Sequence, residues 1–260
     1  MAGLPPVVPG DPIVVSATLY RTYVTCPQQA LGRLQGAYPG ESLPAFRGQL
    51  AHRVFARHLV EGGMADADLG RVCREEIGSN LNPKLGALGI TKPSQLAPII
   101  AEVGDLYARF RRVSTDGFNA AGVSLEAEPA PGVVVRGIVD AVFDDPVSGT
   151  RIVDWKTGSG LGDAAAQLEF YCLAWWLERG ELPGRAEAVS VATGERFGMT
   201  PTSDHVATTA AAVAGLVNAA RGAFSSGKDL ERRGGPHCRY CPLLAECREG
   251  AAAVRVAAAG

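Results

Sequence analysis

The residues best suited to chemistry in this sequence are Asp140, Asp154 and Lys156. Asp154 and Lys156 are two residues apart, so on a strand their side chains share one face, and Asp140 could face the same side from an adjacent paired strand. Mg²⁺ and Mn²⁺ are hard cations that prefer carboxylate oxygens. A bound metal acidifies a water molecule, and a nearby ammonium can orient that water and share negative charge. The three residues therefore predict metal-dependent hydrolysis of phosphodiesters, with Asp140 and Asp154 holding the metal and Lys156 positioning the water.

A hairpin followed by a helix would position these residues. Residues 133–143 alternate as a strand does and are rich in β-branched side chains, residues 144–149 favour a turn, and residues 151–156 form the second strand. After a glycine-rich loop, Asp163 is the expected N-cap of a helix that ends near Gly180.

That helix carries two further polar residues, Gln167 and Tyr171, one turn apart on one face. In order along the chain, these residues resemble the motifs of the PD-(D/E)XK nuclease superfamily, specifically its RecB-like branch, which reads GxxD…(D/E)xK…QxxxY. The matching pairs are Gly137 with Asp140, Asp154 with Lys156, and Gln167 with Tyr171. The resemblance implies that Gln167 and Tyr171 orient the substrate and the surroundings of Lys156, and that the carbonyl of Trp155 is a further metal ligand. An ordinary hairpin with surface charges is the competing interpretation, and these matches in order disfavour it.

An early helix is predicted from Pro44 to Gly62, with an apolar buried side. It contains Arg47-Gly48 followed by His52, which is similar to the RGxxxH pattern of the RecB-like branch. The resemblance implies that His52 is a further metal ligand, whereas a lone helical histidine is more often packed or solvated. His58 is expected at the surface.

The second pattern is C-x₂-C-x₅-C, formed by Cys238, Cys241 and Cys247. Three thiols so close together favour binding of a soft metal, and a closed site needs four ligands. Cys26 is followed by proline, as Cys241 is, and is the natural fourth ligand; His237 is the alternative. The spacing alone is compatible with zinc or an iron–sulfur cluster.

With the preceding motifs, this arrangement resembles the iron–sulfur subset of RecB-like nucleases, which includes CRISPR-associated RecB-like exonucleases, the AddB subunit and the nuclease modules of Adn helicase–nucleases. The resemblance implies a [4Fe–4S] cluster that pins the two ends of the domain together. The implied ligands are Cys26, Cys238, Cys241 and Cys247. The family also often has a glutamate near the metal, and whether Glu126 or Glu128 plays that part stays open. No GxxxxGK[ST] sequence is present, so a helicase or recombination partner would have to supply any motor.

Composition restricts the classes of function. The chain has 260 residues, of which 47% are hydrophobic, and its net charge of −2 argues against a general polyanion binder. Nucleic-acid binding would therefore need a local basic face. No apolar run approaches the roughly 20 residues that span a bilayer, and no secretory signal is recognisable. Six cysteines without a signal peptide suggest a reducing compartment, and we expect the cytoplasm.

The expected fold is α/β, with a mixed central sheet flanked by helices, a restriction-endonuclease-like core and a clasp between the N- and C-terminal segments. The expected parts are a flexible arm (1–15), one nuclease domain (16–250) with a helical part (16–120), a catalytic core (121–200) and a C-terminal helix with the cysteine clasp (201–250), and a tail (251–260). Other expected elements are helices at 16–26, 28–34, 66–77, 94–113 and 203–223, a loop at 80–93, a short strand at 123–128, and a hairpin at 185–199.

The sequence thus predicts a metal-dependent deoxyribonuclease, with Mg²⁺ or Mn²⁺ as its metal. The resemblance implies an exonuclease that acts on single-stranded DNA or DNA ends in repair, recombination or a related pathway. One alternative is a catalytically silent, DNA-binding scaffold of a helicase complex. Another is a zinc or redox protein, which leaves the Gln167–Tyr171 helix unexplained. Cleavage polarity, exo- or endonuclease mode, DNA or RNA preference, pathway and oligomeric state stay open.

Overall fold

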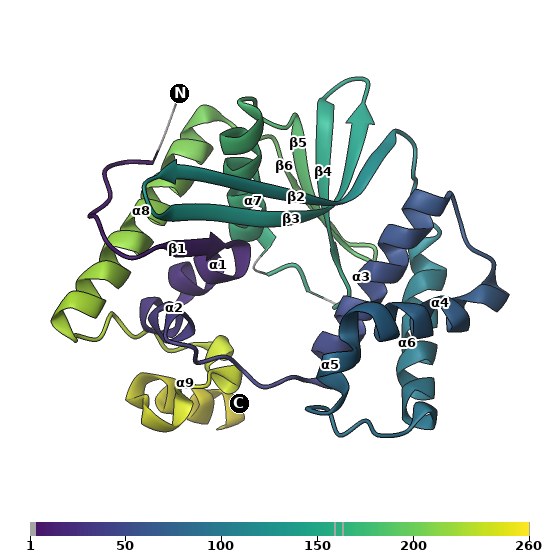
Figure 1. Cartoon of the computed structure of the whole chain (residues 1–260), viewed down its shortest axis with the longest axis horizontal. Coiled ribbons are helices and arrows are strands. Elements are labelled where there is room, and N and C mark those ends of the chain that lie inside the picture. The colour runs from purple at the N-terminus through teal and green to yellow at the C-terminus, as the bar shows by residue number, and fades with distance from the viewer. Residues whose placement is uncertain (1–3, 159, 163, 260) are drawn as a thin grey trace.

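The long strand β3 pairs with three other strands and joins the two halves of a mixed sheet (Figure 1). The structure is a computed structural model that describes residues 4–158, 160–162 and 164–259. Within these residues the six strands follow the order β1-β3-β4-β5-β6, and β2 pairs with β3 outside this path. Strands β2 and β4 run antiparallel to β3, β1 runs parallel to it, β5 runs parallel to β4, and β6 is antiparallel to β5. The strands are β1 (Ile13–Ser16), β2 (Phe118–Ala130), β3 (Val133–Asp145), β4 (Gly149–Lys156), β5 (Arg185–Ser190) and β6 (Arg196–Met199).

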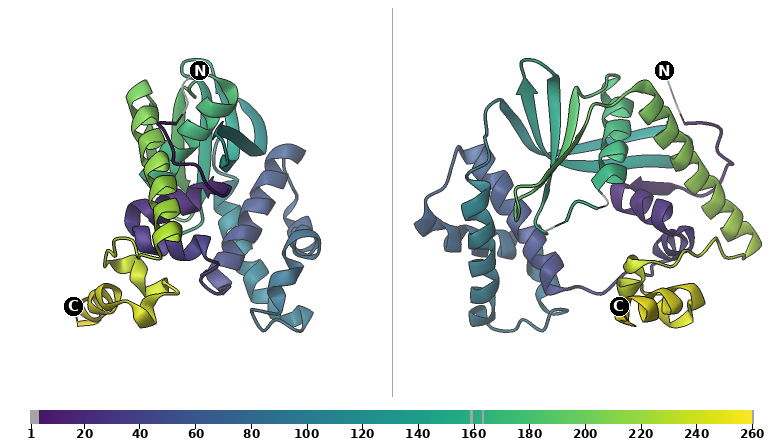
Figure 2. Two further views of the ribbon diagram at one scale, coloured as in Figure 1. Left: turned by 60° about the vertical axis from the view of Figure 1, so that its left-hand side comes forward. Right: turned by 180° about the vertical axis from the view of Figure 1, so that it is seen from behind.

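Helices cover both faces of this sheet (Figure 2). Two buried apolar clusters mark the faces: α1, α7 and α8 contribute to one, and α3, α4 and α6 contribute to the other. In the second cluster the rings of Phe55 and Phe110 stack with centroids 4.2 Å apart. The expected mixed sheet flanked by helices is therefore confirmed. The helices are α1 (Ala17–Thr25), α2 (Pro27–Leu34), α3 (Leu43–Glu61), α4 (Leu69–Glu76), α5 (Asn82–Leu85), α6 (Ala97–Phe110), α7 (Ala164–Arg179), α8 (Ser203–Ser226) and α9 (Arg248–Ala259).

Local sequence explains where the main helices begin and end. The Ser16 side chain accepts a hydrogen bond from the backbone N–H of Leu19 and caps α1, and Ser42 caps α3 in the same way. Gly62, at φ 72°, ends α3 in the left-handed conformation that glycine adopts at little cost. The expected cap Asp163 lies outside the described residues. Of the helices that the structure describes, none has the length and apolar character needed to cross a membrane.

Four stretches differ from the sequence-based expectation. Strand β1 lies in the stretch that was expected to be a flexible arm, and α9 occupies the stretch expected to be a tail. Strand β2 begins at Phe118, five residues before the expected strand. Helical structure also continues through 77–85, into the expected loop. Strand β1 has only four residues, too few for its periodicity to be recognised, and it forms by pairing with β3. Helix α9 is rich in alanine, which has a high helix propensity.

The segment before β1 is held against α8 by the buried side chain of Arg221. Its guanidinium donates hydrogen bonds to the carbonyls of Val8, Gly10, Asp11 and Gly132. Because these carbonyls belong to the N-terminal segment and to the β2–β3 turn, one cation on α8 ties together three distant parts of the chain.

Candidate active site

Asp140 lies at a fork in the sheet. The pairing of β3 with β1 ends at Arg136, and its pairing with β4 begins at Ala141, so the residues between them have no strand partner on that edge. Where the strands diverge, the backbone N–H of Trp155 loses its partner on β3. It donates instead to the carboxylate of Asp140, at 2.7 Å from Oδ2. The fork therefore places this carboxylate beside the end of β4.

Strand β4 ends in the two other residues of the predicted motif. Asp154 is only 3% exposed, and Lys156 Nζ lies 2.8 Å from its Oδ2. Between them, Trp155 points to the opposite face, where its ring meets Phe110 at a centroid distance of 5.2 Å. This alternation is the expected one for a strand and fixes Asp154 and Lys156 on one side.

The side-chain amide of Gln167 connects the site to α7. Its Oε1 accepts a hydrogen bond from Lys156 Nζ (2.5 Å), and its Nε2 donates to Asp154 Oδ1 and to Tyr171 Oη (both 2.8 Å). A Cβ on Gly137 would lie 3.3 Å from the Tyr171 ring, so the glycine three residues before Asp140 lets α7 pack closely on β3. The structure thus brings together all six residues of the predicted GxxD, DxK and QxxxY patterns.

His52 reaches the same site from α3. Its Nδ1 lies 3.0 Å from Asp140 Oδ1. A Cβ on Gly48 would lie 3.0 Å from the hydroxyl of Thr157, so this glycine allows α3 to approach the end of β4. The predicted neighbourhood of His52 and Asp140 is therefore present.

The buried site shifts the pKa values of its groups. Burial, and then repulsion from Asp140, raise the pKa of Asp154 to about 6, although Lys156 counteracts them. Burial alone lowers the pKa of His52, but attraction by Asp140 and the hydrogen bond with it outweigh burial, so the pKa is raised. Burial also raises the pKa of Tyr171, which keeps its hydroxyl protonated. The site therefore holds two carboxylates whose mutual repulsion favours the binding of a cation.

The donor types fit a hard divalent cation, with carboxylates from Asp140 and Asp154, an imidazole from His52, and the Trp155 carbonyl nearby in sequence. The buried Oδ2 of Asp154 supports this fit, because it contacts the ammonium of Lys156 at 2.8 Å and has no neutral hydrogen-bond donor among the described residues. However, no group of three or more His, Cys, Asp or Glu side chains within residues 4–158, 160–162 and 164–259 is arranged to hold a metal ion. His52 and Lys156 instead contact the carboxylates directly.

The structure adds one residue that the sequence did not indicate. Arg21 of α1 donates from Nη1 to Gln167 Oε1 at 3.4 Å, and its charge acts against the rise in the pKa of Tyr171. No spacing pattern connects it with Gln167, because the two residues are brought together only by the packing of α1 on α7.

Three other residues are placed away from the site. Glu126 pairs with Arg136, and Glu128 accepts a hydrogen bond from the backbone of Gly132, so neither glutamate joins Asp140. The expectation that His58 is a surface residue was wrong. It is half-buried, its Nδ1 lies 2.8 Å from Tyr107 Oη, and its ring packs edge-on against Phe110. Burial, with a contribution from Arg111, lowers the pKa of His58.

The C-terminal cysteines and Cys26 line one hollow, although they lie far apart in sequence. The backbone N–H of Arg233 points to Cys26 Sγ (3.5 Å), and that of Gly250 donates to Cys247 Sγ (3.3 Å). Burial raises the pKa of Cys241, and Cys238, Cys26 and Cys247 raise it further. All six cysteines are free thiols. His237 also lines the hollow, and its Nε2 lies 3.5 Å from Cys238 Sγ.

The two remaining cysteines lie elsewhere. Cys73 is a buried residue of α4 and Cys172 is a buried residue of α7, and they belong to different apolar clusters. Burial raises the pKa of Cys73 to about 11 and that of Cys172 to about 12. Both thiols therefore stay protonated at neutral pH and pack as small apolar groups.

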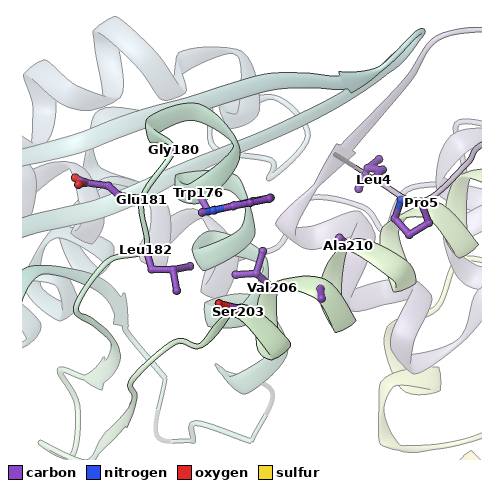
Figure 3. Close-up of a pocket in the computed structure, with 10 residues that line it drawn as sticks. Leu4, Pro5, Trp176, Gly180, Glu181, Leu182, Ser203, Val206 and Ala210 are labelled. Atoms are coloured by element: carbon purple, nitrogen blue, oxygen red, sulfur yellow. The ribbon is translucent and has the colours of Figure 1, made fainter. Parts of the chain in front are cut away.

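Two hollows differ in their relation to these residues. One hollow, of about 670 Å³, is the mouth of the carboxylate site, and its lining includes His52, Asp140, Thr157 and the exposed side chain of Ile138. Another lies between α7, α8 and the N-terminal segment, where Trp176 and Val206 face it (Figure 3). None of the predicted site residues is among the described residues that line this second hollow.

The mixed sheet presents Asp140 at a fork and Asp154 with Lys156 on the next strand, and Gln167 of α7 packs against them. This arrangement defines a nuclease-like α/β fold. The chain belongs to the PD-(D/E)XK nuclease superfamily, because the model of that family matches residues 14–248. No curated protein has a sequence that matches this chain.

A solved structure has a similar fold at low sequence identity. A crystal structure from Eubacterium rectale, described as that of a candidate exonuclease, is 13% identical, covers 90% of this chain and 87% of its own, and has a TM-score of 0.53. The crystal structure of SSO0001 is also 13% identical, covers 93% of this chain and 88% of its own, and has a TM-score of 0.41. At 13% identity, the likeness to the Eubacterium rectale structure concerns the fold alone.

The raised pKa of Asp154 predicts how stability depends on pH in metal-free buffer. The pKa of Asp154 is about 6 in the folded state, against 3.8 ordinarily. Its ionisation therefore leaves the free energy of unfolding unchanged below pH 3.8 and lowers it as the pH rises from 3.8 through 6. Asp154→Asn removes this penalty. Urea unfolding in EDTA should therefore show the variant gaining about 2–3 kcal/mol over the wild type between pH 4 and pH 8.

Asp145→Asn provides a control of opposite sign. Hydrogen bonds from the backbone of Ser148 and Val147 lower the pKa of Asp145, so its charge stabilises the hairpin above the ordinary pKa. This variant should lose stability relative to the wild type as pH rises. If the stability difference between Asp154→Asn and the wild type is the same at pH 4 and pH 8, ionisation of Asp154 does not destabilise the fold, and the prediction is wrong.

Proposed function

We propose that this protein is a metal-dependent deoxyribonuclease of the RecB-like branch, acting as an exonuclease on single-stranded DNA or DNA ends. The observation that carries the proposal is the buried network of Asp140, Asp154 and Lys156, in which the second oxygen of Asp154 lies 2.8 Å from the ammonium of Lys156. A buried carboxylate with a raised pKa costs stability, and such groups are concentrated at functional sites.

Each residue of the network has a role that its contacts support. Asp140 and Asp154 would hold Mg²⁺ or Mn²⁺, assisted by His52 and the Trp155 carbonyl. A bound ion supplies Lewis-acid stabilisation of the phosphate and a water molecule of lowered pKa. Lys156, kept in place by Asp154 and Gln167, positions that water and balances charge on the phosphate.

Gln167 keeps the lysine and the carboxylate in a fixed relation. Its amide has two acceptor contacts, from Lys156 and Arg21, and two donor contacts, to Asp154 and Tyr171. The amide orientation is therefore determined by all four partners. Tyr171, protonated and buried, completes this set and orients the substrate through Gln167.

The lining of the mouth supports a single-stranded substrate. Ile138 is 57% exposed beside Asp140, and Pro44 and Leu81 also line the hollow. Apolar side chains next to a phosphate-cleaving site suit the sugar and base of an unpaired nucleotide, whose base faces are accessible. The description of the Eubacterium rectale neighbour as a candidate exonuclease supports cleavage from an end.

A [4Fe–4S] cluster bound by Cys26, Cys238, Cys241 and Cys247 is part of the proposal. Four thiols around one hollow fit the ligand set of such a cluster. A single zinc ion bound by the same thiols is the competing assignment. The cluster would clasp α1 to the C-terminal segment.

The biological setting is proposed from the same features. A superfamily nuclease without a P-loop motif fits work beside a helicase or recombination partner in DNA repair or a related pathway. Six free thiols fit a reducing compartment such as the cytoplasm. The second candidate, a silent DNA-binding scaffold, would retain binding without cleavage, and the presence of Asp140, Asp154 and Lys156 in one network disfavours it.

The proposed chemistry predicts metal-dependent cleavage. Purified protein should degrade an end-labelled single-stranded oligonucleotide in Mg²⁺ or Mn²⁺ and be inactive in EDTA. Asp154→Ala should abolish cleavage because a metal ligand is lost, and Lys156→Ala should lower kcat by about 10²–10⁴-fold while metal still binds. Gel electrophoresis of the labelled products measures cleavage by the wild type and by both variants.

The exposed Lys92, which caps the short turn before α6, provides the control. Lys92→Ala removes the same charge as Lys156→Ala and should keep full activity. Unchanged cleavage by Asp154→Ala would contradict the site assignment. DNA binding by a wild type that cuts no strand in either metal would support the scaffold instead.

The cysteine hollow predicts a coloured protein. Anaerobically purified protein should be brown, absorb broadly near ~400 nm and contain about four iron and four sulfide per chain. Cys26→Ala should lose the iron as completely as Cys241→Ala, because both thiols line the hollow. Both variants should also unfold at a lower temperature, since ligand binding adds to folding free energy.

Cys73→Ala and Cys172→Ala are matched controls, because both thiols are buried in apolar clusters elsewhere, and both variants should stay brown. His237→Ala should stay brown as well. A colourless protein with one zinc would refute the cluster. Full iron in Cys26→Ala together with loss of iron in His237→Ala would make His237 the fourth ligand.

A further inference from the structure

A further hollow, of about 830 Å³, lies between the end of α6 and the turn that joins β5 to β6. Arginines from two elements line it, Arg109 and Arg112 from the end of α6 and Arg196 from β6. One carboxylate, that of Asp105, also lines it. The hollow therefore collects three guanidinium groups against one carboxylate in a chain whose net charge is −2.

Within the described residues, Arg109 and Arg112 form no ion pair, and Arg196 only shares one carboxylate with two other arginines. Arg109 donates to the carbonyl of Ala192, which is neutral. The side chain of Arg112 has neither an ion pair nor a hydrogen bond with any residue that the structure describes. Arg196 lies 3.7 Å from Glu187, whose carboxylate is shared with closer contacts to Arg151 and Arg185.

Arg109 and Arg112 differ from most other arginines of the described residues, which lie within 4 Å of a carboxylate. Examples on the helices beside α6 are Arg47 with Glu102 and Arg57 with Glu75. The positive charge at the end of α6 is thus a local feature, of the kind that a net acidic protein needs for contact with a polyanion.

The segment that follows Lys156 connects the carboxylate site with the wall of this hollow. Thr157 lines the mouth of the carboxylate site, and the next residue, Gly158, accepts a hydrogen bond from Ser190 Oγ at 2.9 Å. Ser190 lines the arginine hollow and pairs with Lys156 in the sheet. A strand that leaves the mouth across Thr157 and Gly158 therefore meets the arginines next.

We infer that the hollow lined by Arg109, Arg112 and Arg196 is a phosphate subsite for the DNA strand beyond the scissile phosphate. It binds the backbone phosphates of one strand, through charge and not through base identity, and it holds the substrate while Asp140 and Asp154 serve the cleaved bond. This inference rests on the proposed nuclease function and adds the path of the strand to it.

The test uses two substrates of different reach. Thymidine 5′-monophosphate p-nitrophenyl ester contains one nucleotide and cannot span both hollows, whereas a 30-nucleotide single strand can. In Mn²⁺, the double variant Arg112→Gln/Arg196→Gln should lose about tenfold in kcat/KM on the 30-nucleotide strand, mainly through KM, and keep wild-type activity on the ester. Fluorescence anisotropy in EDTA should show the slope of log K against log salt falling by about 1.4, which is the loss of two phosphate contacts on a single strand.

The control is Arg239→Gln/Arg255→Gln, which removes the same charge from exposed arginines near the C-terminal helix α9. It should leave both substrates and the salt slope unchanged. The variant Arg112→Lys/Arg196→Lys should bind DNA nearly as tightly as the wild type, because the subsite acts through its positive charge.

Three results would overturn the inference. Equal losses on the ester and on the long strand would mean that the arginines support the fold of the carboxylate site. Unchanged kinetics and salt slope on the long strand would remove the subsite and leave the nuclease function standing. A wild type that hydrolyses neither substrate, while Arg112→Gln/Arg196→Gln binds DNA as tightly as the wild type, would reject the function and the subsite together.

Discussion

The hydrogen bond from the Trp155 N–H to the carboxylate of Asp140 is the contact on which the site depends. It joins β3 to β4 after their backbone pairing has stopped, so a side chain takes the place of a ladder bond. The divergence of the strands makes room for two carboxylates and a lysine between α3 and α7. A fully paired sheet would have satisfied the backbone without a carboxylate and would have left no space at this point.

This arrangement places destabilising charge in the interior, and the surrounding elements keep it there. Asp154 is buried with a raised pKa, and it is held by the amide of Gln167 and the ammonium of Lys156. Glycines at positions 48 and 137 allow α3 and α7 to approach closely enough to supply His52 and Tyr171. Helix α1 connects the site with the cysteine hollow, because it carries Arg21 beside Gln167 and is followed directly by Cys26.

Local patterns were enough to predict the hairpin of β3 and β4 and the helix that carries Gln167 and Tyr171, whereas the convergence of these two residues with Asp140 was implied by the resemblance to the nuclease motifs. Alternation and helical periodicity act within a few residues, and the motif spacing records which faces meet. The contribution of Arg21 and the burial of His58 could not be predicted in this way, because both follow from contacts between elements that are distant in sequence. Strand β1 was missed for the same reason, since its four residues become a strand by pairing with β3.

We propose above all that Asp140 and Asp154 form a binding site for a divalent metal ion. Diffraction from crystals soaked in MnCl₂ and measured at the manganese absorption edge tests it most directly. We predict an anomalous peak at roughly 2.0–2.2 Å from carboxylate oxygens of both residues, a usual distance for oxygen ligands of such ions. Well-ordered crystals that show manganese elsewhere, or none within bonding distance of either carboxylate, would contradict the account.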